Sequence, residues 1–511
     1  MKAAPDVASL DSWARLIRTG AVLLRHDALL PKETEHLLPP IPRFLAAVLR
    51  TLFAKRTKDR AGERYAKALH DLGPAFIKLG QILSTRGDIF GERFTRDLAH
   101  LKDRLPPFPK AVAEATILES LGAPANEIFA EFGDVIGSAS IAQAHEARMK
   151  DGRKVAVKIL RPNIERIIAA DIAMLTLGAG IIAFFFPSAK RLEPEAFVAT
   201  VATSLLLELD LRLEASAADE LGQIINKEPW MKAPKIVWHH VARRVLVIEW
   251  ADGIPLSRPE ALELPGLDKK ETADNLIRAF LSQALDHGVF HADLHEGNLF
   301  VAAPAKLTAI DFGIIGRLRP KERRYLAEML WGFLRRDYKR VAEVHFEAGY
   351  VPAHQNVDSF AQALRAVGEP VLGRQATEVS MGRLLSQLFE ITAQFEMHLR
   401  PELVLLQKTM VSVEGVARRI YPEHNLWEAA RPVVRAWISR ELSPVVEARR
   451  LFERLVHKLR LDDDVEAGTP RRGYVELEAL KVGAQQGRTF GLIALIVSVI
   501  SLGVIIWVAV R

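Results

Sequence analysis

The chain has no cysteine among its 511 residues. This absence excludes disulfide bonds, thiolate nucleophiles and zinc or iron–sulfur sites with cysteine ligands. Glycine is scarce in one important stretch, IGSASIAQAHEARMKDGRKVAVK, residues 136–158, which ends like a strand with a phosphate-handling lysine. The loop before such a strand normally reads G-x-G-x-x-G-x-V. Here those positions hold Gly137, Ala139, Ala142 and Ala144, so only one glycine remains to let the backbone approach a phosphate closely.

Charged residues are absent from FGLIALIVSVISLGVIIWVAV, residues 490–510. The run is long enough for one membrane-spanning helix, and Trp507 stands near its end, where an interfacial aromatic residue would lie. Several basic residues precede the run, and Arg511 alone follows it. The positive-inside rule therefore predicts a C-terminal anchor and a cytoplasmic main body. Residues 1–30 lack the apolar core of a signal peptide.

The net charge of +6 is compatible with binding to nucleic acid or to an anionic membrane. The apolar tail favours the membrane, and we expect no nucleic-acid partner. The basic segment EARRLFERLVHKLRL, residues 447–461, fits a helix lying on an anionic bilayer, and equally a helix packed on a soluble domain. A second apolar run, residues 172–187, is short for a span and contains Gly178 and Gly180, so we expect a core or membrane-touching helix.

Hydrophobic periodicity divides the chain into helical and strand-forming parts. Short amphipathic helices are expected before residue 60, interrupted at LLPPIP, and KVAVKIL and RRVLVIEW are expected to be strands. The segment from Pro255 to Arg440 is mostly helical by its period. The predicted parts are amphipathic helices at 1–60, a helical extension at 61–132, an N lobe at 133–254, a C lobe at 255–440, a basic helix and linker at 441–488 and an anchor at 489–510.

The segment HADLHEGN, residues 291–298, carries the strongest chemical signal. It matches the kinase catalytic loop H-R-D-L-x-x-x-N at every fixed position except the arginine. Asp293 is the predicted catalytic carboxylate, and Asn298 is a predicted magnesium ligand. Asp311, in AIDFG, is the second predicted magnesium ligand, suited to an ion that bridges phosphates.

Lys158, at the end of VAVK, is the predicted lysine for the α- and β-phosphates of ATP. Such a lysine needs an acidic partner, and ELDLRLEA, residues 208–215, offers Glu208, Asp210 and Glu214. The alternate leucines from 207 to 213 fit a strand better than a helix. If this segment is helical, Asp210 and Glu214 repel each other unless cations such as Lys158 and Lys78 approach.

Several segments together resemble the AarF/UbiB family of atypical kinase-like proteins, over nearly the whole chain. They are LGPAFIKLGQILSTRGDIF, GSASIAQAH, VAVKILRP, ELDLRLEA, HADLHEGNLF and DFGIIGRL. Two later segments, PELVLLQKTMVSVEGVARRIYP and LWEAARP, resemble the bacterial members that serve ubiquinone biosynthesis. The resemblance implies an α+β, two-lobed protein-kinase-like fold with a helical N-terminal extension, to which we add the C-terminal transmembrane helix. It also implies that ATP and Mg²⁺ are the cofactors.

The resemblance also assigns site residues. In this family an alanine-rich loop replaces the glycine-rich one. The resemblance makes Glu214 the helical partner of Lys158. The K-x-G-Q motif of the family places Lys78 and Gln81 over the active site. Without the family, Lys78 and Gln81 would be read as part of a basic patch on an amphipathic helix. The complete predicted nucleotide-binding set is Ile136, Gly137, Ser138, Ala139, Ser140, Ile141, Ala142, Gln143, Ala144, Lys158, Glu249 and Gln81, and the predicted catalytic set is Asp293, Lys158, Glu214 and Lys78.

The chain departs from the family pattern at a few positions. Glu296 stands where proline is usual, Ala144 where valine is usual and Gly137 where alanine is common. Many bacterial members have two terminal spans, so the anchor is expected to cross once or twice. Ala292 replaces the catalytic-loop arginine, and no A-P-E follows DFGIIGRLRPKERR, so a platform for a peptide substrate is not expected.

These features predict a membrane-anchored atypical kinase or ATPase that supports ubiquinone biosynthesis at the bacterial inner membrane. Its expected partners are ATP, an isoprenoid quinone precursor or another lipid, an anionic membrane and other ubiquinone-biosynthesis proteins. The alternative is a non-catalytic module in which ATP gates lipid binding. A flavin-dependent ring hydroxylase is disfavoured, because the chain has no G-x-G-x-x-G opening a dinucleotide-binding unit.

Overall fold

The structure is a computed structural model, and it describes residues 10–28, 59–83, 94, 97–98, 105–185, 193–373, 391, 394–397 and 401–441. Within these ranges, no helix has both the length and the apolar character that crossing a bilayer requires. The predicted anchor at 489–510 and the basic segment at 447–461 lie outside the described residues. They stay predictions.

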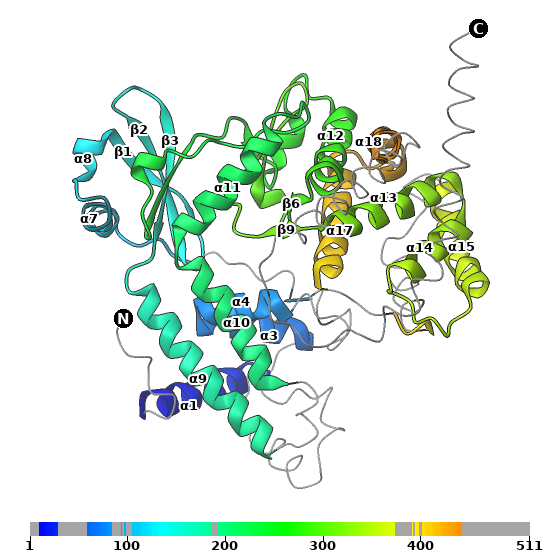
Figure 1. The fold of residues 1–511 in the computed structure, drawn as a ribbon. Helices are drawn as coiled ribbons and strands as arrows, with labels where there is room; N and C mark the ends of the chain where they lie inside the picture. The colour runs from blue at the N-terminus through cyan, green and yellow to red at the C-terminus, as the bar shows by residue number, and fades with distance from the viewer. Residues whose placement is uncertain are drawn as a thin grey trace, which may run out of the picture. The chain divides into compact units, whose positions relative to one another are not determined.

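Four antiparallel strands form the N-lobe sheet in the order β1 (Phe129–Ser138), β2 (Ala142–Met149), β3 (Lys154–Leu160) and β4 (Val245–Glu249). Strands β3 and β4 confirm the two strands expected from β-branched runs. Because successive strand side chains alternate in direction, Val155, Val157 and Ile159 enter a core shared with α7 (Lys110–Leu121) and α8 (Ala125–Ile128). Figure 1 shows α7 and α8 beside this sheet. Lys158 therefore lies on the opposite face.

The helices α9 (Ile164–Phe185), α10 (Pro194–Glu208) and α11 (Leu211–Ile225) share a second core with the sheet. The apolar run at 172–187 is thus helical through Phe185, as expected. The strand predicted across 207–213 is wrong. One helix ends at Glu208 and the next begins at Leu211, where the side chain of Asp210 caps it by accepting from the backbone N–H of Arg212.

This helix break explains why the leucine pattern was misleading. Leu209 and Leu211 are buried, whereas Leu207 and Leu213 are exposed. The two buried leucines flank the capping residue, so both contact the core although the chain changes direction between them. An alternating pattern appears because two helices meet at this point.

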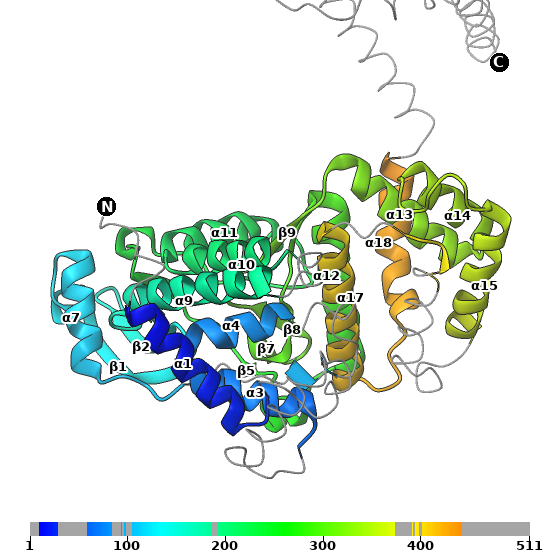
Figure 2. The ribbon, with the colours of Figure 1, turned by 90° about the horizontal axis from the view of Figure 1, so that it is seen from below.

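The N-terminal helices α1 (Leu10–Arg25), α3 (Ala61–Leu72) and α4 (Pro74–Leu83) lie beside α9. Figure 2 shows α1, α3 and α4 on the side turned towards the viewer. Gly73 separates α3 from α4 with a φ of 105°, a backbone conformation that side chains with a Cβ rarely adopt. The shared core of α3, α4 and α9 includes Leu69, Phe76, Ile77 and Met174.

The C lobe is mostly helical, as predicted, with short strands around the catalytic loop. Strands β5, β7 and β8 form one antiparallel sheet, and β6 pairs with β9. The elements are β5 (Ile254–Pro255), α12 (Lys269–Ser282), β6 (Val289–His291), β7 (Leu299–Ala302), β8 (Lys306–Ala309), β9 (Ile315–Arg317), α13 (Pro320–Arg335), α14 (Tyr338–Glu347), α15 (Val357–Gly373), α17 (Pro401–Ile420) and α18 (Leu426–Glu441).

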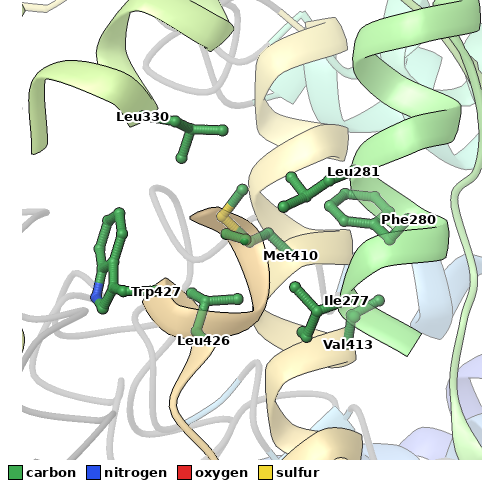
Figure 3. Close-up of a pocket in the computed structure, with 9 residues that line it drawn as sticks. Ile277, Phe280, Leu281, Leu330, Met410, Val413, Leu426 and Trp427 are labelled. Carbon is green, nitrogen blue, oxygen red and sulfur yellow. The ribbon is translucent and has the colours of Figure 1, made fainter. Parts of the chain in front are cut away.

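Helix α17 packs lengthwise against α12 in the C lobe. Figure 3 shows Met410 and Val413 of α17 turned towards Ile277, Phe280 and Leu281 of α12, around an apolar cavity. The cavity has a volume of about 10 Å³, room for at most one water molecule. It is a packing gap of the C-lobe core, and the charged residues of the predicted site lie elsewhere.

Candidate active site

Lys158 is the centre of a cluster of charged side chains from both lobes. Its Nζ lies 2.6 Å from Glu214 Oε1 on α11 and 3.6 Å from Asp311 Oδ1. Burial alone would lower the pKa of Lys158, but Asp311 and Glu214 together raise it above its ordinary value. Lys158 is therefore a charged ammonium held between two acids, of which the family resemblance predicted Glu214 as its partner.

The two carboxyl groups beside Lys158 respond differently to their surroundings. The charge of Lys158 is the main cause that lowers the pKa of Asp311. Burial raises the pKa of Glu214, and the nearby Asp311 adds to this effect although Lys158 opposes it. Asp311 is therefore the firmly ionised member of the pair, and Glu214 is the first of the two to take up a proton as the pH falls.

Asp311 also has an unusual backbone conformation. Its φ is 59°, in the left-handed region that residues other than glycine seldom occupy. Its Oδ1 accepts a hydrogen bond from the backbone N–H of Gly313 at 3.3 Å. Strain of this kind costs about 1–3 kcal/mol and persists only where the surrounding structure imposes it, often at functional sites.

His291 connects the catalytic loop to the strand that precedes Asp311. Its Nδ1 accepts from the backbone N–H of Asp293 at 3.1 Å, so the proton is on Nε2, which faces the carbonyl oxygen of Ile310 at 3.3 Å. Burial lowers the pKa of His291, which keeps the ring neutral in this role. The ring thus fixes the backbone at Asp293 relative to the residue immediately before Asp311.

Asn298 presents a free amide oxygen near the same backbone. Its Nδ2 donates to the carbonyl oxygen of Asp293 at 3.1 Å, and no hydrogen bond to its Oδ1 occurs within the described ranges. Its own carbonyl accepts from the backbone N–H of Ile310 at 2.9 Å, which joins the catalytic loop to the strand before Asp311.

The amide oxygen of Asn298 and the ionised carboxylate of Asp311 fit a magnesium ion. This ion prefers oxygen ligands and is usually held by one or two protein groups together with substrate phosphates. Among the described residues, this site included, no group of three or more His, Asp or Glu side chains could hold a metal ion without further ligands such as phosphates.

Asp293 itself is partly open to solvent, with 38% of its side chain exposed. His295 Nε2 lies 3.6 Å from its Oδ2. On the other side, α17 supports the loop: Thr409 Oγ1 donates to the carbonyl oxygen of Ala292 at 3.0 Å, and Ser412 Oγ donates to that of Leu294 at 3.3 Å. The two residues that flank Asp293 are therefore bound by one helix.

Lys408, adjacent to Thr409 on α17, lies near the predicted site, and sequence reasoning did not single it out. Its side chain is exposed, and within the described residues it makes no hydrogen bond or ion pair. Desolvation lowers the pKa of Lys408. The charge of Asp293 opposes this shift, and the charge of Lys78 adds to it. Lys408 thus lies in the field of the predicted catalytic acid and of a second lysine. No motif in its sequence neighbourhood signalled this.

Lys78 reaches the same cluster from α4. It forms an ion pair with Glu208, at the end of α10, and its charge acts on both Asp311 and Lys408. Asp210 pairs instead with Arg212, at 2.6 Å. The K-x-G-Q lysine is therefore brought into the site, but its partner is a different acid from that of Lys158. Gln81 is partly buried one turn further along α4.

The alanine-rich loop forms a tight turn between β1 and β2. The backbone N–H of Ala139 donates to the carbonyl oxygen of Ala142 at 2.8 Å, which closes the turn around Ser140 and Ile141. Arg161 donates to Ser138 Oγ at 2.7 Å and to the carbonyl oxygen of Ala139. Arg161 follows β3 directly, within the quoted VAVKILRP, and its role in fixing this turn was not predicted.

Gly137 does not need to be glycine in this turn. Its φ lies outside the left-handed region, and a Cβ added there would meet open space. This departure from the usual alanine is therefore compatible with the same backbone. Ile136, before it, is exposed, whereas Ala142 is buried in the core shared with α9 and α10.

The remaining members of the predicted nucleotide-binding set lie in different environments. Ala144 is the direct partner of Lys158 in the β2–β3 ladder. Gln143 is buried and turned away from this role: its Oε1 accepts from the backbone N–H of Phe108 at 2.9 Å, and its Nε2 faces His145. Glu249 ends β4 and lies 3.5 Å from Arg153. The structure does not bring Gln143 or Glu249 into the charged cluster.

The segment after Asp311 is short. Strand β9 ends at Arg317 and α13 begins at Pro320. Arg317 forms a two-point ion pair with Glu220 of α11, at 2.6 and 2.8 Å, which ties this segment to the helix that carries Glu214. Glu296, which replaces the usual proline, pairs with Arg419 of α17.

Two family models and several curated proteins match this chain. A family model described as the ABC1 atypical kinase-like domain matches residues 100–345, and one described as the UbiB helical domain matches residues 364–425. A probable protein kinase UbiB from Marinobacter nauticus is 40% identical over 437 residues, covering 84% of this chain and 79% of that protein. A probable protein kinase UbiB from Pseudomonas aeruginosa is 38% identical over 445 residues, covering 85% of this chain and 83% of that protein.

One solved structure, the complex of Rv3197 with erythromycin from Mycobacterium tuberculosis, has a TM-score of 0.53 and 22% sequence identity. The match covers 77% of this chain and 97% of the chain in that structure. This similarity supports the kinase-like α+β fold.

Proposed function

The chain belongs to the UbiB family of atypical kinase-like proteins, and we propose that it binds ATP with Mg²⁺ and uses ATP hydrolysis or phosphoryl transfer in ubiquinone biosynthesis. The observation that carries the proposal is the position of Lys158 between Glu214 and Asp311, next to the loop that presents Asp293 and Asn298. Such a set contains the protein groups that hold ATP and its metal ion and orient the acceptor in phosphoryl transfer.

Each residue has a separate task in this proposal. Lys158 neutralises the α- and β-phosphates, and Glu214 keeps its ammonium in place. Asp293 accepts the proton of the attacking hydroxyl or water, while the bond between the γ-phosphorus and the bridging oxygen breaks. A bound Mg²⁺ would supply charge neutralisation at the phosphates, with Asn298 and Asp311 as its protein ligands.

Lys78 and Lys408 add positive charge beside this set. Lys408 repels Lys78, and within the described residues it has no partner of its own, although it lies close enough to Asp293 to feel its charge. A phosphate beside Lys408 would offset its repulsion from Lys78, because opposite charges attract at short range. We assign Lys408 to the γ-phosphate side of the nucleotide.

The acceptor in this proposal is water, a lipid or another small molecule rather than a peptide. The short connection from β9 to α13 leaves little chain for a peptide-binding platform. The enzyme would act at the inner face of the bacterial inner membrane, held by its C-terminal anchor, with a quinone precursor or lipid as the presented ligand and other biosynthetic proteins as partners.

The test is ATP turnover by the purified full chain, measured with and without vesicles that contain anionic lipid and with quinone-precursor analogues. We expect magnesium-dependent ADP release, stimulated by vesicles or by the analogue. Tight ATP binding without any turnover under all these conditions would instead identify a nucleotide-gated lipid-binding module. Absence of ATP binding would refute the proposal.

A further inference from the structure

Helix α1 exposes a row of three large apolar side chains, whereas two polar side chains on its opposite face are buried. Leu10, Trp13 and Ile17 are 89%, 44% and 71% exposed, whereas Ser12 and Thr19 are only 3% and 9% exposed. With about 100° per residue in an α-helix, positions 10, 13 and 17 share one face, and 12 and 19 share the opposite one. An amphipathic helix of a soluble domain normally has the reverse arrangement.

The inward face of α1 is held by a partly buried ion pair. Arg15 Nη1 donates to Asp171 Oδ1 on α9 at 3.0 Å, and only 8% of the Asp171 side chain is exposed. Leu16, next to Arg15, packs against the core that includes Met174 of α9. Turning α1 to bury its apolar face would leave the carboxylate of Asp171 buried without its partner, which is strongly unfavourable. The outward orientation of the apolar face is therefore imposed by the fold.

Two arginines border the outward face. At 100° per residue, Arg18 and Arg25 lie at one edge of the row formed by Leu10, Trp13 and Ile17. Both are exposed, and in the part of the chain that the structure describes neither makes an ion pair or hydrogen bond. An apolar row with a tryptophan and unpaired arginines along one edge matches the headgroup region of an anionic bilayer, where aromatic rings and arginine side chains are both favoured.

We propose that the face of α1 formed by Leu10, Trp13 and Ile17 lies in the interface of an anionic lipid bilayer, with Arg18 and Arg25 at lipid phosphates. This inference rests on the membrane location in the proposed function, and it adds a second contact at the opposite end of the chain from the predicted anchor. A protein partner or a second copy would explain the apolar row, but it would give no specific reason for two unpaired arginines along its edge.

Helix α1 shares a hydrophobic core with the helix that carries the K-x-G-Q lysine. The core that receives Leu16 of α1 also contains Phe76 and Ile77 of α4, the helix that carries Lys78. The helix of the K-x-G-Q motif therefore packs in the same core as the inward face of the helix that is proposed to contact the membrane.

The absence of cysteine makes a direct test possible. Ile17→Cys introduces one thiol on the outward face, and Lys306→Cys introduces one at an exposed position on β8 as the control. Each full-length variant is labelled with an environment-sensitive fluorophore and mixed with zwitterionic vesicles or with vesicles containing a third of anionic phospholipid. Flotation and ATP turnover are measured on the same samples.

We expect the label at position 17, but not the one at 306, to shift to the blue and to become accessible to a lipid-soluble quencher with anionic vesicles. Combining Ile17→Cys with Arg18→Gln and Arg25→Gln should abolish at least most of that shift while flotation persists through the anchor. If the chain floats with the vesicles but the label at position 17 shows neither the blue shift nor the quenching, the inference is wrong.

Two other results would also overturn it. A blue shift without vesicles would mean that a second copy or another segment of this chain covers the face. A chain that does not float with any vesicle would refute the membrane location itself, whereas normal flotation without ATP turnover would count against the proposed catalysis alone.

Discussion

Arg161 donates hydrogen bonds from Nε and Nη2 to the carbonyl oxygen of Ala139, at 3.0 and 2.9 Å. The backbone N–H of Arg161 also donates to the carbonyl oxygen of Ile141 at 2.9 Å. The turn that replaces a glycine-rich phosphate loop is therefore held from the adjacent strand end by one side chain. Alanine restricts the backbone of this turn, and Arg161 fixes its position.

Replacing Arg161 with methionine should weaken nucleotide binding. Hydrogen bonds that involve a charged group contribute about 1.5–3 kcal/mol, so losing those to Ser138 and Ala139 should raise the Kd for ATP roughly tenfold or more. The measurement is calorimetric titration with ATP, alongside the melting temperature of the variant. Arg148→Met, which changes an exposed arginine at the other end of β2, is the matched control. Equal affinities for both variants would show that the fixed turn does not contribute to binding.

Ala139→Gly should change how the loop distinguishes ATP from ADP. Glycine removes the methyl group that limits close approach of the backbone to a phosphate and allows positive φ. We expect a changed ratio of ATP to ADP affinity, or increased self-phosphorylation, in calorimetry and labelled-ATP transfer assays. Identical affinities and identical transfer in the variant and the wild type would mean that the alanine has no functional consequence.

Asp311→Asn and Asp293→Asn should affect different steps. An amide at position 311 removes the anionic magnesium ligand and the partner of Lys158, so magnesium-dependent ATP turnover should be lost. Asp293→Asn should lower turnover by about 100-fold or more while nucleotide binding is largely kept, because this residue acts on the acceptor. Turnover and ATP affinity are measured for each variant. Wild-type rates in both would contradict the assigned roles.

Lys408→Met should lower turnover and reduce the preference for ATP over ADP. Removing a positive charge beside the transferred phosphoryl group costs on the order of 100-fold in rate in comparable sites. The expected ADP affinity is nearly unchanged, since the proposed contact is with the γ-phosphate. Lys339→Met, which removes an exposed lysine paired with Asp358, is the control. A variant with normal kcat and a normal ATP-to-ADP affinity ratio would exclude Lys408 from the site.

Asp171 should make stability depend on pH between about 4 and 6. Burial raises its pKa to about 6, although Arg15 opposes the shift. The folded chain then binds the proton more tightly than the unfolded chain, so this contribution to stability is present at low pH and is lost as the pH rises through 6. Between pH 7 and pH 5, the wild type should gain on the order of 1 kcal/mol relative to Asp171→Asn. Denaturant unfolding of both proteins at these pH values measures the difference. A constant difference would contradict the raised pKa.

Local sequence was sufficient for the parts of the site that lie on short, continuous segments. The strand of Lys158 was predictable because alternating valines fill one face of a sheet. The segments HADLHEGN and AIDFG were recognisable because their polar residues have a fixed spacing within one loop or turn. The family resemblance then supplied Glu214 as the partner of Lys158, and the 2.6 Å ion pair confirms that they meet.

The tertiary structure decided the relations between distant segments. Period alone suggested a strand across 207–213, because a helix break capped by Asp210 gives the same alternation of leucines. Because the chain changes direction at this break, Glu208 forms an ion pair with Lys78 and Glu214 forms one with Lys158. Lys408 could not be found from sequence, because its helix, α17, lies more than a hundred residues after the catalytic loop. The hydrogen bond from Thr409 to Ala292 joins residues 117 positions apart.

The amphipathic character of the first helix was also evident from the sequence, but its orientation was not. A hydrophobic pattern defines two faces of a helix, and it does not state which one the rest of the chain will cover. The ion pair between Arg15 and the buried carboxylate of Asp171 favours one choice, because a buried carboxylate without its cation is strongly unfavourable. Sequence determined the chemistry of each element, and the packing of elements distant in the chain determined which charges meet and which surface remains outside.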